Sequence, residues 1–260
     1  MHTGTLAKCV VNASAALLLA SAALVASAMP AAAQSGSGDG FLFRAPTATL
    51  TVYGGFAQPL ASGGVFQLAT SELTLGRADF GAGNLGFDLT RTVAPRFEVV
   101  IGVDRSSSRT RSEYREWVDN NDQPIEQVTA LQRTPVTASV RYFLAERGRK
   151  IGSVAWVPTR LVPFVSVGAG VMKFKFEQVG DFIDQQTFNV FSERLRSTGW
   201  AGVLQAGAGA QWSLSPRVNL TGELRYQRAS GNGDEPYGDF SGYKVNLSGV
   251  STLIGLTLRL

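Results

Sequence analysis

The C-terminal stretch, Tyr243 to Leu260, constrains the fold more than any other part of the chain. From residue 249 onward two sets of side chains alternate, which is the period of a β-strand. One set is apolar apart from a threonine: Val250, Thr252, Ile254, Leu256, Leu258 and Leu260. The other is small or polar apart from a leucine: Gly249, Ser251, Leu253, Gly255, Thr257 and Arg259. In water such a terminal strand would expose an apolar edge that promotes aggregation. It is stable where it closes a barrel and its apolar face contacts lipid.

The N-terminal segment, residues 1–33, has the pattern of a secretory signal peptide. Lys8 gives it a positive start, residues 9–28 are apolar and rich in alanine, and a run of three alanines ending at Ala33 fits a small-residue cleavage site. A retained membrane anchor is the alternative interpretation. We therefore expect export, with residues 34–46 as a short linker rich in glycine and serine.

Cleavage after Ala33 would remove the only histidine, His2, and the only cysteine, Cys9. The remaining chain then has no disulfide and neither of the side chains that usually bind transition metals, so we expect no metal and no cofactor. The formal net charge is only +4 and the sequence shows no basic patch, which argues against a nucleic-acid partner. Beyond residue 33 the chain lacks an apolar run long enough for a transmembrane helix.

Eight segments with strand periodicity follow the linker. We expect strands at about 47–57, 80–91, 96–105, 128–144, 161–176, 198–213, 217–228 and 243–260. The connections mostly alternate between tight turns and long polar loops. The tight turns are predicted at 92–95 and 214–216, and the loops at 58–79, 106–127, 177–197 and 229–242. An extension of the first hairpin over Phe66 to Leu75 is the alternative within the loop at 58–79.

An even number of strands with turns at one end and loops at the other is typical of bacterial barrels. The predicted fold over residues 47–260 is therefore all-β, an eight-stranded antiparallel up-and-down transmembrane β-barrel. Two places deviate from the pattern. Residues 145–160 should be a short turn, and they either lengthen the adjoining strands or form a small hairpin. Pro135 cannot donate to a ladder, so we expect a bulge or an end of pairing there.

Two tryptophans, Trp200 and Trp212, share one face of the strand at 198–213. Their separation along a strand tilted by about 40° corresponds to roughly 30 Å along the membrane normal. Indoles prefer the two membrane–water interfaces, so we expect these residues to form an interface girdle. The alternative is a chance pair of core tryptophans in a soluble β-sandwich.

Charged residues fall on the predicted inward face of several strands. They are Asp88, Glu98, Asp104, Arg141, Glu223 and Arg225. An eight-stranded barrel is just wide enough to be filled by side chains, and charges confined there must be paired. We expect a structural ionic network that fills the lumen, while a polar path for a solute and a catalytic role are the alternatives.

The predicted loops after residues 105 and 176 carry mixed charge, with arginines such as Arg109, Arg111, Arg194 and Arg196. Mixed charge is typical of a solvated surface. The alternative is that these arginines contact the phosphates of lipopolysaccharide, because a guanidinium binds phosphate in a bidentate manner.

From Thr47 to Leu260 the chain resembles the eight-stranded outer-membrane barrel families, of the OmpA transmembrane domain, OmpX and OmpW type. Its last residues also resemble the C-terminal insertion signal of these barrels, through Gly255, Leu258 and Leu260. The family usually ends in an aromatic residue and has a polar residue where this chain has Leu253. The resemblance implies insertion by the barrel-assembly machinery into the bacterial outer membrane, with lipid and lipopolysaccharide as neighbours, and we expect a monomer.

The resemblance leaves the function open, because these families differ in function. Barrel enzymes of this size use a histidine as base, which the exported chain lacks, so we expect no enzymatic activity. Our first hypothesis is a non-enzymatic barrel with a structural or surface-interaction role in the envelope. The alternatives are an OmpW-like conduit for small or hydrophobic solutes and a soluble ligand-binding barrel.

Overall fold

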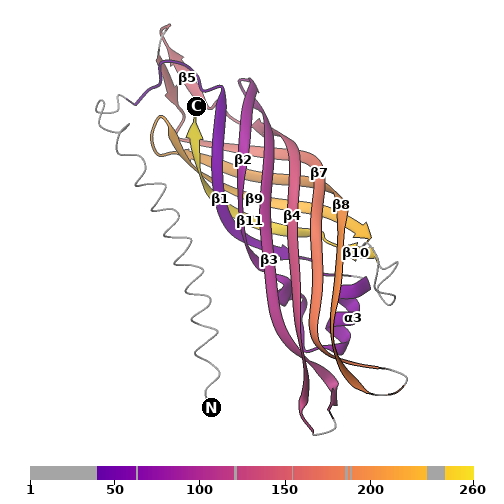
Figure 1. Ribbon diagram of the computed structural model, residues 1–260. Coiled ribbons are helices and arrows are strands. Elements are labelled where there is room, and N and C mark those ends of the chain that lie inside the picture. Colours follow the sequence, from indigo (N-terminus) through magenta and orange to yellow (C-terminus); the bar gives the residue numbers. More distant parts are fainter. Residues whose placement is uncertain are drawn as a thin grey trace, which may run out of the picture. The chain divides into compact units, whose positions relative to one another are not determined.

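A closed ring of eight antiparallel strands forms the body of the protein (Figure 1). The structure is a computed structural model that describes residues 40–62, 64–119, 122–153, 155–184, 187, 189–232 and 244–260. The ring strands are β1 (Ala48–Pro59), β2 (Ala82–Ala94), β3 (Phe97–Val118), β4 (Pro124–Phe143), β7 (Leu161–Ile183), β8 (Val190–Ser213), β9 (Val218–Asn232) and β11 (Gly249–Arg259). Each pairs with the next along the chain, and β11 pairs with β1. The predicted eight-stranded up-and-down barrel is therefore confirmed.

The closing pair, β11 with β1, follows the alternation seen in the sequence. Leu256 lies opposite Val52, and both point outward. Thr257 lies opposite Thr51, and their hydroxyl oxygens are 2.8 Å apart inside the barrel. Because apolar partners meet outside and hydroxyl partners meet inside, a slip of one residue would reverse both faces at once.

The barrel has two dissimilar ends. The end that carries the tight connections β2–β3 and β8–β9 and the start of β1 is here called the turn end, and the opposite one the loop end. At the turn end β5 (Gly148–Ile151) and β6 (Ala155–Pro158) form a separate hairpin, which is one of the two alternatives foreseen for residues 145–160. Leu42, in the predicted linker, pairs with Trp156 of β6. The expected signal peptide, residues 1–33, lies outside the described residues.

The prediction of a loop is wrong for two segments, because most of their residues continue the adjoining strands. The segment predicted as a loop at 106–127 belongs mainly to β3 and β4, and that at 177–197 mainly to β7 and β8. Both hairpins extend past the rest of the barrel at the loop end (Figure 1). The outer faces of these extensions carry charged side chains, so they lack the apolar alternation that predicts the rest of the strands.

The predicted loop at 58–79 contains a helix, α3 (Gly64–Glu72), and a 3-10 turn, η1 (Arg77–Phe80). The alternative, an extension of the hairpin over Phe66 to Leu75, is wrong. Phe66, Ala69 and Leu73 are buried, and their spacing of three and four residues places them on one side of a helix. The predicted loop at 229–242 lies mostly outside the described residues, and the short strand β10 (Lys244–Asn246) precedes β11.

Pro135 does not produce a bulge. The pairing of β4 with β7 is continuous there, with Pro135 opposite Met172. On the other side the ladder to β3 lacks two pairs between Val103↔Val136 and Ser106↔Arg133, and the register is unchanged across the gap. The missing amide donor therefore interrupts one ladder locally, as a proline in a strand must.

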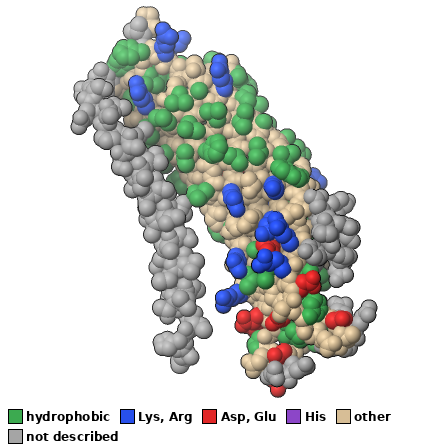
Figure 2. Space-filling model, in the orientation of Figure 1, with side chains coloured by type: hydrophobic (Ala, Val, Ile, Leu, Met, Phe, Trp, Pro, Cys, Tyr) green, Lys and Arg blue, Asp and Glu red, His purple; other side chains and the backbone are tan. Residues whose placement is uncertain are grey.

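The outer surface of the barrel carries an apolar band, visible as green side chains in Figure 2. Its exposed members come from every ring strand and include Val52, Phe87, Ile101, Val140, Val167, Leu204, Leu224 and Ile254. The described part of the chain contains no helix that is long and apolar enough to cross a membrane.

We predict that Leu256→Arg lowers the free energy of unfolding by about 2–4 kcal/mol, because Leu256 is an exposed member of the band and a charge near mid-bilayer is costly. Leu214→Arg is the matched control. It lies beyond Trp212 at the turn end, where the cost should be about 0–1 kcal/mol. Reversible unfolding by denaturant in lipid vesicles measures both. Equal losses for the two variants would show that the band does not face lipid.

Candidate functional site: the closed lumen

The interior of the barrel holds an ionic network made by four carboxylates and two arginines. Asp88 projects inward from β2, Glu98 and Asp104 from β3, Arg141 from β4, and Glu223 and Arg225 from β9. All six side chains are buried, so the structure brings together every charged residue that the sequence placed in the lumen.

Arg225 is the most connected member. Its guanidinium donates from Nε to Glu223 at 3.0 Å, from Nη1 to Asp104 at 3.4 Å and from Nη2 to Asp88 at 3.4 Å. Nη1 also donates to the hydroxyl of Tyr53 at 3.2 Å. One arginine on β9 thus joins carboxylates from β2, β3 and its own strand, and it ties distant strands together across the lumen.

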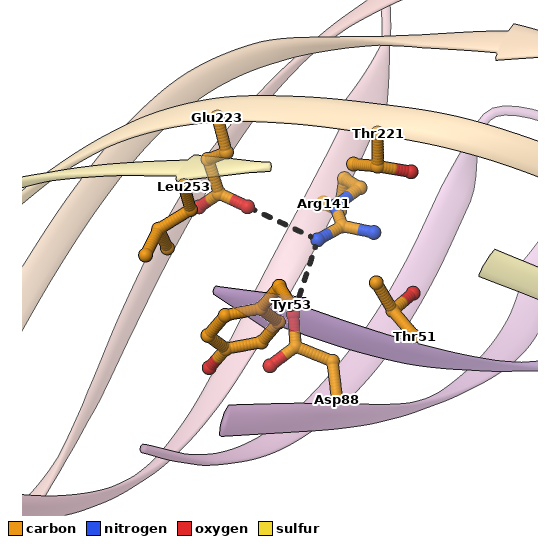
Figure 3. A pocket seen from close by; sticks show the side chains of 7 residues that line it. All are labelled: Thr51, Tyr53, Asp88, Arg141, Thr221, Glu223 and Leu253. Carbon is orange, nitrogen blue, oxygen red and sulfur yellow. Dashed lines mark hydrogen bonds and ion pairs between the residues drawn. The ribbon is translucent and has the colours of Figure 1, made fainter. Parts of the chain in front are cut away.

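Arg141 repeats this arrangement toward the turn end. Its Nη2 lies 3.5 Å from an oxygen of Asp88 and 3.4 Å from one of Glu223 (Figure 3). Its Nη1 lies 3.9 Å from Glu98. Asp88 and Glu223 are therefore shared by both arginines. Sharing offsets the cost of burying charge, because each ion has several opposite partners in place of water.

Glycines on neighbouring strands make room for the two shared carboxylates. A Cβ at Gly102 would come within 2.4 Å of a carboxylate oxygen of Asp88, and a Cβ at Gly207 within 2.7 Å of one of Glu223. Both glycines face inward. The network therefore depends on the absence of two side chains as much as on the charges themselves.

Sequence reasoning missed three members of the lumen. Arg147, in the connection between β4 and β5, folds back and forms an ion pair with Glu98. Tyr53 is buried on the inner face of β1, where its hydroxyl accepts from Arg225. Arg133 is buried on the same strand as Arg141, nearer the loop end, and donates to the carbonyl of Leu247 at 3.2 Å. The inward period of β4 could have shown Arg133, whereas nothing in the sequence indicates where the connection carries Arg147.

The cavity left between the network residues is small. It measures about 10 Å³ and is bordered by Thr51, Tyr53, Asp88, Arg141, Thr221, Glu223 and Leu253 (Figure 3). A single water molecule requires at least about 10–15 Å³. The lumen at this level therefore has room for about one water and for no organic solute.

Apolar clusters lie on both sides of the network. At the turn end Phe143, Val162 and Phe164 pack together, and the Arg141 guanidinium stacks 4.4 Å from the Phe164 ring. At the loop end a larger cluster, the α3 plug, joins α3 and η1 to the inner face of the barrel. Its members include Val65, Phe66, Ala69, Leu73, Phe80, Leu131, Met172, Phe174, Phe176, Val203 and Leu247.

Phe66 is the centre of the α3 plug. It is fully buried, and its ring makes edge contacts with Phe80 at 5.0 Å and with Phe176 at 5.7 Å between centroids. Phe174 and Phe176 continue the inward face of β7 beyond Met172, which means that the lumen changes from polar to apolar along one strand. The helix thus covers an apolar mouth of the lumen.

The remaining predicted residues lie where the alternation put them. Trp200 and Trp212 both point outward from β8, at opposite ends of the apolar band, and are 59% and 46% exposed. In β11, Gly255 faces inward opposite Tyr53 and Leu258 is on the outer face, and Leu260, directly after the strand, is exposed. Their proposed roles, as interface girdle and as assembly signal, remain predictions.

No group of three or more His, Cys, Asp or Glu side chains among the described residues is arranged to hold a metal ion. The network carboxylates are instead directed at guanidinium groups. The arrangement is suited to fixing strands against each other, because every carboxylate of the network has an arginine partner.

Comparison with known proteins gives structural similarity without sequence similarity. No protein-family model matches the chain, and no curated protein sequence matches it. Among solved structures, Neisserial surface protein A (NspA) is 9% identical, with 82% of this chain and 97% of that chain covered and a TM-score of 0.47. A major outer membrane protein from Thermus thermophilus is 15% identical, with 84% and 100% covered and a TM-score of 0.44.

The outer membrane protein OprG from Pseudomonas aeruginosa is also 15% identical, with 84% of this chain and 99% of that chain covered and a TM-score of 0.42. The chain is thus similar to eight-stranded outer-membrane barrels. At these identities the similarity concerns the fold, and the architecture itself rests on the ring of strands described above.

We predict that Arg225→Ala lowers the free energy of unfolding by about 3–5 kcal/mol, because it leaves buried carboxylates without their shared cation. Glu223→Ala combined with Arg225→Ala should cost less than the two single changes added, with a coupling of about 0.5–3 kcal/mol. Arg228→Ala, an exposed arginine on the same strand, is the control and should change stability little. Additive costs in denaturant unfolding would contradict the network.

Proposed function

We propose that this protein is a non-enzymatic integral barrel of the bacterial outer membrane, whose lumen is closed and whose role is structural or is exercised at its surface. The observation that carries the proposal is the filled interior, in which a paired ionic network lies between two apolar clusters. A barrel whose interior is filled by its own side chains can contact other molecules only through its outer surface, so we place its function there.

The location in a membrane is supported by the direction of the side chains. A soluble ligand-binding barrel would turn its apolar residues toward a central cavity, but here large apolar side chains point outward all round the ring, while carboxylates and arginines point inward. An apolar belt of this extent would aggregate in water. Bacterial outer-membrane barrels have this inverted arrangement, with lipid outside and a polar lumen.

The structure supports the closed barrel over the conduit for solutes. The network leaves a cavity of about 10 Å³, and the α3 plug covers the loop end with apolar side chains. A conduit needs a path past both layers. Each arginine that would have to move is tied to carboxylates on other strands, so opening would break several buried ion pairs together.

A surface role is supported by the two long hairpins, β3–β4 and β7–β8, which project at the loop end (Figure 1). They continue the barrel wall as paired sheet, which gives a rigid surface on which contacts can be presented. In an outer-membrane orientation with the turn end toward the periplasm, these hairpins face the cell exterior.

The location is tested by fractionation. We predict that the protein remains in the outer-membrane pellet after alkaline carbonate extraction, because lipid contact through the apolar band resists high pH. An outer-membrane protein of known location and a periplasmic soluble protein serve as the two controls. Recovery in the soluble periplasmic fraction would contradict the proposal and favour the ligand-binding alternative.

Closure is tested by conductance in planar bilayers. We predict that the wild-type protein gives small and rare openings at most. A variant in which a Gly/Ser linker replaces α3 should stay closed, because the ionic network lies below the plug. Adding Arg141→Ala, Glu223→Ala and Phe164→Ala to that variant, and so also thinning the apolar cluster at the turn end, should produce measurable openings. Steady, large conductance of the wild-type protein would mean that the charges line a wet path, and the solute conduit would then be the better function.

A further inference from the structure

Cations gather on the outer face of the sheet just beyond the apolar band, where Figure 2 shows blue side chains between the green band and the red loop end. Six exposed cations of β3, β7 and β8 form what is here called the cation patch: Arg105, Arg109, Arg111, Lys173, Arg194 and Arg196. The sequence pattern assigns most of them to solvated loops. Since they lie in paired strands, their relative positions are fixed by the ladder.

The strand register places the arginines in two columns. Arg109 on β3 and Arg196 on β8 lie on one rung, joined through Ala130 and Glu177. Arg111 and Arg194 lie on the next rung of the same face, joined through Val128 and Val179.

The columns are thus three strand spacings apart, about 14 Å along the sheet. Small or apolar side chains, such as Val128 and Val179, occupy most of the strip between them.

Charge within the patch is poorly compensated. Glu177 is the acid of these rungs, and it forms ion pairs with Lys175 and with Arg194. The hydrogen bond from Lys175 holds the pKa of the Glu177 carboxyl below its usual value, so this acid is ionised at neutral pH. The next rung toward the loop end carries acids, with Glu113 opposite Glu126. The cations therefore form a layer between an apolar band and an acidic tip.

The patch begins at the expected membrane interface. Lys173 is the cross-strand partner of Trp200, and its ammonium lies 5.9 Å from the centre of the indole ring. Arg196 and Arg194 lie four and six residues before Trp200 on β8, toward the loop end. At about 3.3 Å per residue and about 40° of tilt, they stand roughly 10–15 Å above the girdle.

We propose that the cation patch is a binding site for a phosphorylated glycolipid of the outer leaflet, with phosphates held by the two arginine columns and the lipid lying against the strip between them. Arginine is the side chain best suited to phosphate, because its planar fork donates two parallel hydrogen bonds. Cations that stand well above the girdle match phosphates carried on sugars above the acyl chains. The proposal rests on the membrane location proposed above.

A lipid is favoured over a soluble polyanion because the patch continues directly from the apolar band on the same outward face. A ligand that covers both surfaces must have acyl chains next to its anionic groups. A soluble polyanion would be expected to contact the exposed tips of the hairpins, but these carry acids such as Glu113, Glu116 and Glu126.

The experiment titrates the folded, detergent-solubilised full barrel with lipid A and counts bound lipid by native mass spectrometry. The probes are lipid A with two phosphates and its dephosphorylated form. The patch variant replaces Arg109, Arg111, Arg194 and Arg196 by glutamine. The control variant replaces four exposed cations at the turn end by glutamine and so removes the same charge: Arg91, Arg149, Lys150 and Arg217.

We expect the wild-type protein and the control variant to bind the phosphorylated probe at least tenfold more tightly than the dephosphorylated one, and the patch variant to lose this preference. Lysine at the four patch positions should restore part of it, and heat-modifiable mobility on gels checks folding. An equal loss in the control variant, or no effect of phosphate on the wild type, would overturn the proposal.

A second outcome would also overturn it, namely binding of a sulfated polysaccharide to the patch with no preference for phosphorylated lipid A. The membrane location is tested separately, because a barrel that fails to bind lipid A would still resist carbonate extraction. Failure of the lipid site and failure of the proposed function are therefore distinguishable.

Discussion

The sharing of Asp88 and Glu223 between Arg141 and Arg225 is the interaction on which the rest of the structure depends. A charge is costly to bury unless it has water or an opposite charge beside it. Because the outer face of each strand is apolar, the polar side chains of the strand point into the lumen. Two guanidinium groups with shared carboxylates satisfy the buried charges of three strands, β2, β4 and β9, together. The same solution removes the space that a solute would need.

The filling of the lumen changes character along the barrel axis. In the middle it consists of ion pairs, and at both ends it consists of apolar side chains such as Phe164 and Phe66. The apolar ends separate the ion pairs from bulk water, which strengthens each of them. In the proposed closed barrel, stability and the lack of a conducting path thus have one physical cause, and contacts with other molecules are made at its exterior.

The part of the barrel that carries the apolar band could be predicted from the sequence, because there the two faces of a strand differ sharply. Leu85, Phe87 and Asp88 illustrate this, since apolar side chains point out and the carboxylate points in. The loop-end extensions of β3 and β8 could not be found in this way, since their outer faces carry arginines in place of apolar side chains. The α3 helix left a weak signal in the spacing of Phe66, Ala69 and Leu73, but those residues fit an extended hairpin almost as well. The ion pair of Arg147 depends on how a connection folds, which periodicity does not describe.

Access of water-borne reagents to the lumen tests the central claim most directly. The described chain contains no cysteine, so a single Ser139→Cys introduces one thiol on the inner face of β4, and Ser107→Cys introduces one on the exposed outer face of β3. Both are exposed to a small cationic methanethiosulfonate in lipid vesicles, and labelling is followed by mass spectrometry. The closed lumen predicts that Ser139→Cys stays unmodified over the time in which Ser107→Cys reacts completely, and that it reacts after unfolding in denaturant. Labelling of both sites at similar rates in the folded protein would show that the lumen is open to water.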